Sequence, residues 1–400
     1  MASPIAVQAP PLAGYAEELA RAEGDIARLE LRRRSHPGDL EQRVRLAFRL
    51  FHRASLTGLL AHFEQADAAI VEALADFGAK EDLCLLKANL EFRFHRNGAA
   101  RRQVHRSPLL AGRLEGRVLL ADLDFQEGRY EAARVELERV LQENRAWDTL
   151  ARLAYWHGKL GDPAEADRLY EEAEDDLTAK QMRSFAWLEL QRGVLAFTHG
   201  QFGAASRHYE RAERAYPGHW HTAEHAAELM AAEGRFEEAA AAFLAVIDRA
   251  PKPELQQALG EVYLLAGRPS DAQHWLDVAL AAYLQSADRG EVHYYHHLAD
   301  FYTDARPDGA EAVRWARKDL ELRPNFSTQA ALARALHRNG RIAEAAEYIR
   351  LALASGVKDA GIFAGAAAIF EAGGASEESR RCAEEAARIN CRHGCFHMHH

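Results

Sequence analysis

Cysteine, proline and long apolar runs are all scarce in this sequence. Its 400 residues include only 4 cysteines and 12 prolines. Four cysteines are too few for a disulfide framework in a chain of this length. No apolar stretch approaches the ~18 residues of a membrane-spanning helix, so no membrane insertion is expected. The opening residues, MASPIAVQAPPLAG, lack a basic stretch and are interrupted by prolines. The sequence therefore predicts no secretory signal. It predicts a cytoplasmic location instead.

Excess positive charge is also lacking. The formal net charge is −10, which argues against a nucleic-acid partner bound by neutralising its phosphates. The basic clusters LRRRSH (31–36) and RRQVHR (101–106) are interpreted as solvated helix faces or loops. The sequence has no phosphate-binding glycine loop, no serine nucleophile elbow and no His-Glu-x-x-His helix. We therefore expect a protein that is not an enzyme.

What the sequence does contain is a repeat. Segments 120–141, 153–173 and 259–280 each place a glycine seven residues after a small residue, and an alanine five residues later. The alanine position recurs at intervals of 33, 39, 34, 33, 40, 33 and 34 residues. Its copies are Ala133, Ala166, Ala205, Ala239, Ala272, Ala312, Ala345 and Ser379. The shorter intervals have the length of a helical hairpin, and the two longer ones are interpreted as loop insertions.

This pattern resembles the tetratricopeptide repeat over about residues 114–390. The matching signature positions are Leu259, Gly260, Tyr263, Gly267, Ala272 and Ala279, and the matching closing prolines are Pro217, Pro251 and Pro324. The resemblance implies an all-α fold, a right-handed α-solenoid of stacked antiparallel helix hairpins. One hairpin cannot bury its apolar face alone, so neighbouring hairpins must stack.

On this interpretation the chain divides into four parts. Residues 1–13 are predicted to be disordered, and residues 14–113 to form degenerate helical repeats or an N-terminal cap. Residues 114–390 are predicted to hold about eight repeats, and residues 391–400 a tail rich in Cys and His. A left-handed glycine is expected to end the first helix of a pair at Gly128, Gly161, Gly200, Gly234, Gly267 and Gly340.

The resemblance implies that the first helices line a concave groove. Residues six before, three before and one after the small residue share one face of a helix. In three consecutive repeats this "inner stripe" consists of His221, Glu224, Glu228, Glu254, Gln257, Glu261, His293, His296 and Asp300. Three interpretations are open. The groove holds only water, or it binds a basic or amino-terminal peptide of a protein partner, or His293, His296 and a neighbouring carboxylate hold a metal ion.

The last ten residues, CRHGCFHMHH, collect soft metal ligands. Thiolate, imidazole and thioether groups suit Cu(I) or Zn(II). The candidate ligands are Cys391, His393, Cys395, His397, Met398 and His399. Met398 beside the thiols favours Cu(I), whereas two Cys with two His would complete a tetrahedral zinc site. The competing interpretations are an expression tag, a redox-sensitive disulfide and a flexible end without a role.

Three classes of function are compatible with these features. The first is a non-enzymatic scaffold that binds a protein or peptide partner in the acidic, His-containing groove. The second is a Cu- or Zn-handling protein in which the solenoid selects the partner. The third is a carrier whose Cys tail is modified by another enzyme.

Overall fold

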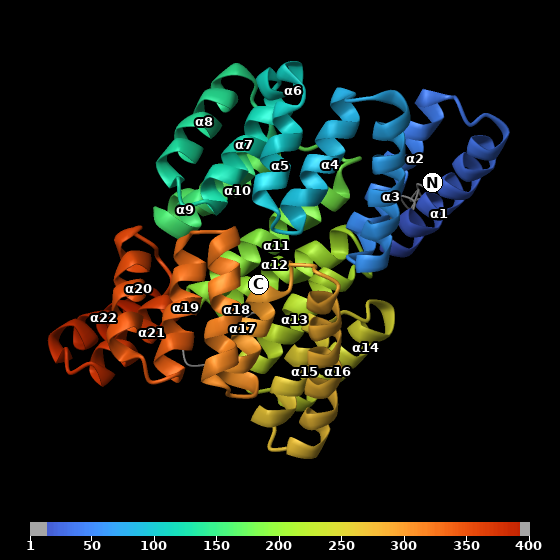
Figure 1. The fold of residues 1–400 in the computed structure, drawn as a ribbon. Coiled ribbons are helices and arrows are strands. Elements are labelled where there is room, and N and C mark those ends of the chain that lie inside the picture. Colours follow the sequence, from blue (N-terminus) through green and yellow to red (C-terminus); the bar gives the residue numbers. More distant parts are fainter. Residues whose placement is uncertain (1–13, 393–400) are drawn as a thin grey trace, which may run out of the picture.

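A computed structural model of the chain describes residues 14–392, which fold into helices joined by short turns (Figure 1). The helices are α1 (Tyr15–Ser35), α2 (Leu40–Thr57), α3 (Leu60–Phe77), α4 (Glu81–Arg93), α5 (Asn97–His105), α6 (Pro108–Gly112), α7 (Leu114–Gln126), α8 (Tyr130–Glu143), α9 (Trp147–Leu160), α10 (Pro163–Asp175), α11 (Met182–Thr198), α12 (Phe202–Ala215), α13 (Trp220–Ala232), α14 (Phe236–Arg249), α15 (Pro253–Leu265), α16 (Pro269–Asp288), α17 (Tyr295–Asp300), the π-helix η1 (Phe301–Ala305), α18 (Gly309–Leu322), α19 (Phe326–Arg338), α20 (Ile342–Ala354), α21 (Ala360–Ala372) and α22 (Ser376–Ile389). The predicted N-terminal disorder at 1–13 and most of the predicted metal-binding tail lie outside the described residues.

From α7 onward, consecutive helices pack as antiparallel pairs, ending with α21 and α22. The alanines that mark the repeat, from Ala133 to Ala345, are all 0% exposed. Each small side chain therefore lets the second helix of its pair lie close to the first helix. At Gly260 the approach is closer still, because a Cβ there would come within 2.8 Å of Leu276 Cγ. The predicted all-α solenoid of stacked hairpins is confirmed.

The turns inside the pairs follow the sequence prediction with one exception. Five of the six predicted glycines have φ between 71° and 79°, the left-handed region that glycine adopts without steric cost. Gly161 differs, with φ −122°. Its helix α9 continues to Leu160, one residue further than the pattern of the other pairs, and the chain then enters α10 through an extended turn.

The two long repeat intervals, interpreted from the sequence as loop insertions, arise from longer loops and longer helices together. Six residues separate α10 from α11 and α16 from α17, against three between α8 and α9. Helix α11 has 17 residues and α16 has 20, against 13 or 14 in helices such as α9 and α13. Apolar residues continue through the added turns of α16, where Tyr283 is fully buried. Burial of these turns against their neighbours favours helix over loop.

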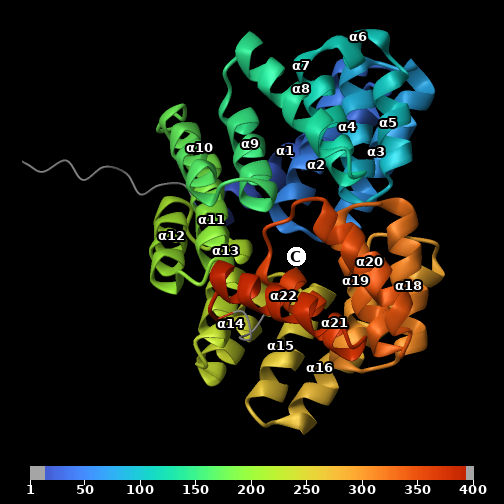
Figure 2. The same cartoon turned by 90° about the vertical axis from the view of Figure 1, so that its left-hand side faces the viewer.

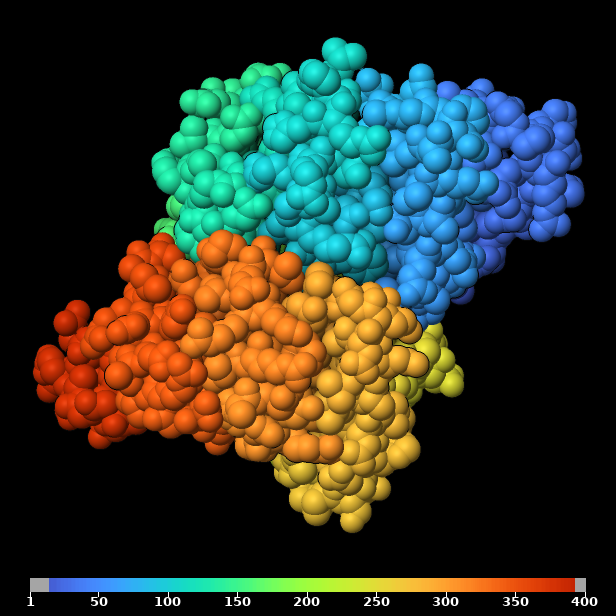
Figure 3. Space-filling view, in the orientation of Figure 1, coloured from blue at the N-terminus to red at the C-terminus, as the bar shows by residue number. Residues whose placement is uncertain are grey.

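The helix pairs wind into a superhelix whose turns touch. In Figure 1, α1–α8 form an upper tier and α15–α22 a lower tier, and α9–α14 connect them, running from the level of the upper tier down to that of the lower one. Figure 2 shows α9–α14 along the opposite side of the molecule from α3–α5 and α18–α20. In the space-filling view of Figure 3, the two tiers meet along a continuous seam.

Contacts between segments that are roughly 160 to 200 residues apart hold the turns of the superhelix together. The Tyr15 amide donates to the Pro217 carbonyl at 3.0 Å, and the Lys358 amide donates to the Lys159 carbonyl at 2.8 Å. The Trp220 indole donates to the Leu56 carbonyl at 2.9 Å. The apolar core that runs through α11–α16 accordingly includes Tyr15 and Leu56. In an open solenoid each repeat contacts only its neighbours. The contacts described here also fix one turn of the superhelix against another.

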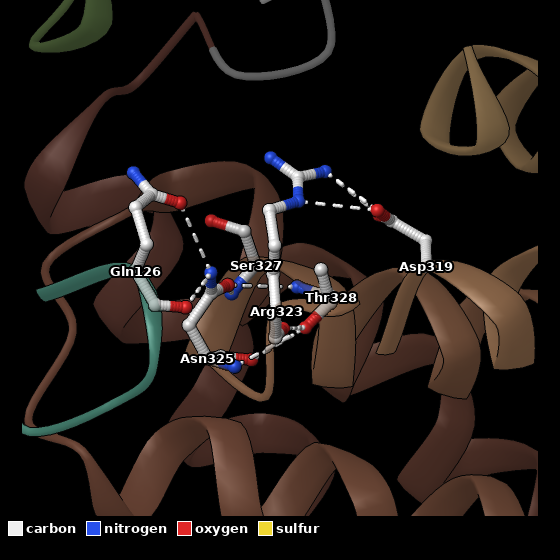
Figure 4. A network of polar contacts seen from close by, with 6 residues as sticks. All are labelled: Gln126, Asp319, Arg323, Asn325, Ser327 and Thr328. Carbon is white, nitrogen blue, oxygen red and sulfur yellow. Dashed lines mark hydrogen bonds and ion pairs between the residues drawn. The ribbon is translucent and has the colours of Figure 1, made fainter. Parts of the chain in front are cut away.

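Asn325 shows how one such contact is built (Figure 4). Its side-chain oxygen accepts hydrogen bonds from the Ser327 and Thr328 amides at 3.0 and 3.1 Å and so caps α19. Its side-chain amide donates to the Gln126 carbonyl, 199 residues earlier, at 3.0 Å. In the turn before the cap, Arg323 pairs with Asp319 at 2.8 Å. One residue thus starts a helix of the lower tier and fastens it to the end of α7.

Among residues 14–392, no helix is both long and apolar enough to cross a bilayer.

Candidate functional site

The inner stripe predicted from the sequence lies on α13 and α15, just before α17, and in α17 itself. Three of its nine residues are buried, Glu224, Glu228 and Gln257, and the other six are half-buried. The stripe converges on Tyr283, whose hydroxyl donates to Gln257 Oε1 at 3.1 Å. Burial raises the pKa of Tyr283, and the charges of Glu254, Glu261 and Asp300 raise it further. Carboxylates of two helices, α15 and α17, therefore act on one phenol.

Three acidic residues of the inner stripe, Glu228, Glu261 and Asp300, have partners within the chain. Glu228 Oε2 lies 2.8 Å from His225 Nδ1, and the amide of Gln257 donates to Glu261 at 2.9 Å. Asp300 faces Arg334 of α19 at 3.5 Å. Much of the negative charge is thus balanced internally, which weakens the long-range attraction of a cationic partner.

The α17 end of the stripe is covered by the chain itself, which differs from the open groove expected from the sequence. The turn between α4 and α5 packs on it: the ring centroids of Phe94 and His293 are 5.1 Å apart, and those of His95 and His296 are 5.2 Å apart. Burial lowers the pKa of His293 to about 4. The cover exists because the superhelix brings α4 of the upper tier onto the start of α17.

Two carboxylates of the stripe each have one buried oxygen without a hydrogen-bond donor among the described residues. These atoms are Glu224 Oε2 on α13 and Glu254 Oε2 on α15. The other oxygen of Glu254 accepts from Lys252 Nζ at 2.6 Å. Lys252 also lies over the Trp220 ring, 4.2 Å from its centroid. A buried acceptor without a donor costs about 1–3 kcal/mol, so both oxygens are suited to an additional N–H group.

The two carboxyl groups differ in charge state. Burial raises the pKa of Glu224 to about 7, helped by the charge of Glu228 and opposed by Lys252. Burial also opposes ionisation of Glu254, but Lys252 and His297 outweigh it and lower the pKa to about 2. At neutral pH Glu254 is therefore ionised, and Glu224 titrates.

Sequence reasoning missed the cations of this region. Lys252 lies in the turn ahead of α15, outside the helical arithmetic that selected the stripe. Arg334 lies on the corresponding face of α19, a helix from which no residue of the inner stripe was selected. Towards the N-terminus the face continues with Tyr155 and Trp187, each 40% exposed, and with Asp122, which pairs with Arg152 at 2.9 Å.

The metal interpretation of the stripe is not supported. Within residues 14–392, no group of three or more His, Cys, Asp or Glu side chains is placed to hold a metal ion. The rings of His293 and His296 are instead engaged in the contact between tiers. Of the predicted tail ligands only Cys391 is among the described residues, and its thiol is exposed just after α22; His393, Cys395, His397, Met398 and His399 lie outside them.

Comparison with known proteins gives one family match and distant structural likenesses. A family model described as tetratricopeptide repeat matches residues 196–261. A crystal structure of the APC/C hetero-tetramer Cut9–Hcn1 is similar with a TM-score of 0.43 and 16% identity, covering 86% of this chain and 73% of that one. A structure of Naa15/Naa10 bound to HypK-THB has a TM-score of 0.29 and 17% identity, covering 92% of this chain and 67% of that one. No curated protein matches the sequence.

The family match spans α12, α13 and α14 with parts of the helices on either side. The pairs before and after it repeat the same buried small residue, and from α7 onward all of them except α9–α10 have the same three-residue turn. The matched segment, residues 196–261, is thus similar to the tetratricopeptide repeat, and the helix pairs on either side of it have the same architecture.

Proposed function

We propose that this chain is a non-enzymatic scaffold whose inner stripe binds a cationic group, a lysine, arginine or amino terminus, from a segment of a protein partner. The observation that carries the proposal is the pair of donor-less oxygens on Glu224 and Glu254. They come from neighbouring first helices and act on each other electrostatically. An ammonium or guanidinium group supplies the N–H donors that both lack, as charge-assisted hydrogen bonds.

We infer that a partner approaches this site from the side of the stripe that the upper tier does not cover. Asp300 keeps 43% of its side chain exposed there. The proposed partner segment therefore approaches along α17 and α19 and places its cation towards α15 and α13. The polar groups of the stripe are paired with one another rather than arranged as a nucleophile with a base, which supports a binding role rather than a catalytic one.

Peptide affinity is expected to rise with pH and to depend on Glu224. The probe is a fluorescein-labelled peptide of alternating lysine and alanine, followed by fluorescence anisotropy. Because the pKa of Glu224 is about 7, its ionised fraction grows between pH 6 and pH 8, and the dissociation constant should fall across that interval. Glu224→Gln removes the charge at nearly constant shape. We expect it to weaken binding about tenfold at pH 8 and to abolish the pH dependence.

The matched control is Glu237→Gln on the exposed surface of α14, where the side chain is 72% exposed. It changes the net charge equally and should leave the affinity unchanged. Saturable binding that is the same in both variants, or no binding by the parent protein at millimolar peptide, contradicts the proposed site.

A second proposal concerns the tail, because the Cys391 thiol is exposed and soft ligands follow it in the sequence. Tagless protein is expected to copurify with close to one Cu(I) or Zn(II) per chain, measured by mass spectrometry of the metal. Cys391→Ser combined with Cys395→Ser should remove it, whereas Cys382→Ala, a buried thiol on α22, should not. Equal metal content in all three proteins contradicts metal binding by the tail. An intact mass above the sequence mass, located in the C-terminal peptide, favours the carrier alternative.

A further inference from the structure

The hollow between α1 and α2 is a second candidate site, separate from the inner stripe. It has a volume of about 620 Å³. Its lining residues repeat at i, i+3, i+4 and i+7 on both helices, so each helix presents a single face to it. They are Asp25, Arg28, Leu29 and Arg32 on α1, and Arg45, Phe48, Arg49 and His52 on α2. We call this surface the α1–α2 seat.

The repeat explains why the seat is open. In the lower tier the first helices pack directly on one another, α17 on α19 and α19 on α21. In the upper tier α2 pairs with α3, and α1 packs on the other side of α2. Helix α1 thus occupies the place of the second helix of a pair. The first helix of that pair has no counterpart among residues 14–392. The missing helix would lie against both α1 and α2, in the position of the seat.

The seat has an apolar floor. Leu29 is 9% exposed, and Phe48 is 42% exposed. The neighbouring Leu46, Ala47 and Leu50 of α2 are buried in the core of the upper tier. Phe48 is not part of that core and leaves a partly exposed aromatic ring in the lining of the hollow, where it can pack on the apolar face of another helix.

The rim of the seat is basic. Four arginines face one carboxylate, Asp25, in a chain whose formal net charge is −10. Asp25 pairs with Arg28 and, at 3.3 Å, with Arg49. Arg45 pairs with the exposed Glu41 at 2.6 Å. The guanidinium of Arg32 makes no hydrogen bond or ion pair with the described residues, so cationic N–H donors remain available to a ligand.

We propose that the α1–α2 seat binds an acidic amphipathic helix of a partner protein. The apolar stripe of that helix packs on Leu29 and Phe48, in the manner of a missing first helix. Its flanking carboxylates pair with Arg28 and Arg32 on one side and with Arg45 and Arg49 on the other. Arginine suits this role because its planar guanidinium can bind a carboxylate through two parallel hydrogen bonds, and helix-in-groove docking uses the same i, i+3, i+4, i+7 spacing.

Other occupants fit the chemistry less well. Residues 1–13 of this chain contain no Asp or Glu, and three of them are proline, so their sequence is not that of an acidic helix. A nucleic acid is recognised along a continuous basic track, whereas Asp25 and Glu41 interrupt the arginines of the seat. An anionic membrane is a flat surface, whereas the apolar residues here line a hollow.

The test uses the full chain and a fluorescein-labelled peptide of about five helical turns, with leucine along one face and glutamate on both flanks. Arg45→Glu with Arg49→Glu changes two exposed side chains and should weaken binding at least tenfold. Phe48→Ala should weaken it by a similar factor without any change of charge. The matched control is Arg139→Glu with Arg380→Glu, which makes the same charge change at exposed positions on α8 and α22.

The outcomes are distinct. Loss of binding in the seat variants but not in the control supports the proposal. It is overturned if the parent protein does not bind the peptide at millimolar concentration, or if the control loses as much affinity as the seat variants. It is also overturned if oligothymidylate or phosphatidylserine vesicles bind equally well with the same dependence on Arg45 and Arg49, which would assign the face to nucleic acid or membrane. Glu224→Gln should leave this affinity unchanged, so failure here is distinguishable from failure of the inner-stripe proposal.

Discussion

Trp220→Ala is expected to lower the free energy of unfolding by about 3–5 kcal/mol, the usual range for removing a buried Trp or Phe side chain. Trp220 is 5% exposed and belongs to the core that joins α1 and α2 to α11–α16. The substitution also removes the hydrogen bond to the Leu56 carbonyl and the ring beneath the Lys252 ammonium. Urea unfolding followed by circular dichroism measures the loss.

A second consequence of the same substitution is a change in cooperativity. Long repeat arrays without contacts between turns lose two-state behaviour, whereas Trp220 ties α13 to the end of α2. Trp220→Ala should broaden the transition or split it, and should increase the radius of gyration measured by small-angle X-ray scattering. Gly58→Ala should act in the same direction, because Gly58 has φ +67° and a Cβ there would come within 2.7 Å of Trp220 Cζ2.

Trp187→Ala is the matched control. Trp187 is 40% exposed and lies on the inner face rather than between turns, with its ring centroid 6.1 Å from that of Trp147. We expect Trp187→Ala to lower the free energy of unfolding by less than about 1.5 kcal/mol and to leave the unfolding transition sharp. If both tryptophan substitutions lower the free energy of unfolding equally, the contact between turns adds no stability beyond ordinary packing within the solenoid.

The contrast between these two tryptophans also marks what could be predicted from the sequence. The alanine period predicts the helix pairs because each pair needs one small residue at a fixed place, and that requirement is local. The contact between Trp220 and Leu56 is not local. It depends on the small rotation between successive pairs, summed over the chain between them, and no single residue encodes that rotation.

The same reason explains the outcome for the candidate site. Helical arithmetic brought together carboxylates that act on one another, such as Glu224 and Glu254. It could not show that Phe94 and His95 would cover His293 and His296, because that cover depends on the pitch of the superhelix. Nor could it place Lys252, which acts from a turn. Periodicity within a helix predicts which residues share a face, and the pitch decides whether that face is open.

Glu18→Gln is expected to lower the free energy of unfolding by about 3 kcal/mol at neutral pH. Glu18 on α1 accepts a hydrogen bond from the Tyr216 hydroxyl at 2.6 Å, 198 residues later in the chain. His52 Nε2 lies 3.1 Å and Arg183 Nη1 3.5 Å from its other oxygen. Burial raises the pKa of this carboxyl, but the hydrogen bonds from His52 and Tyr216 and the charge of Arg183 outweigh burial and lower it to about 2.

The sign of the pH dependence distinguishes this charge effect from a simple loss of packing. A depressed carboxyl pKa stabilises the fold above the unfolded value of 4.5, and the contribution disappears as pH falls from 4.5 towards 2. The difference in stability between the parent protein and Glu18→Gln should therefore be constant from pH 8 to pH 5 and narrow below that. Glu17→Gln, on the exposed side of the same helix turn, should change stability little at any pH. A Glu18→Gln difference that persists unchanged at pH 3 would assign the effect to shape rather than charge, and the carboxylate would not be what joins α1 to the turn between α12 and α13.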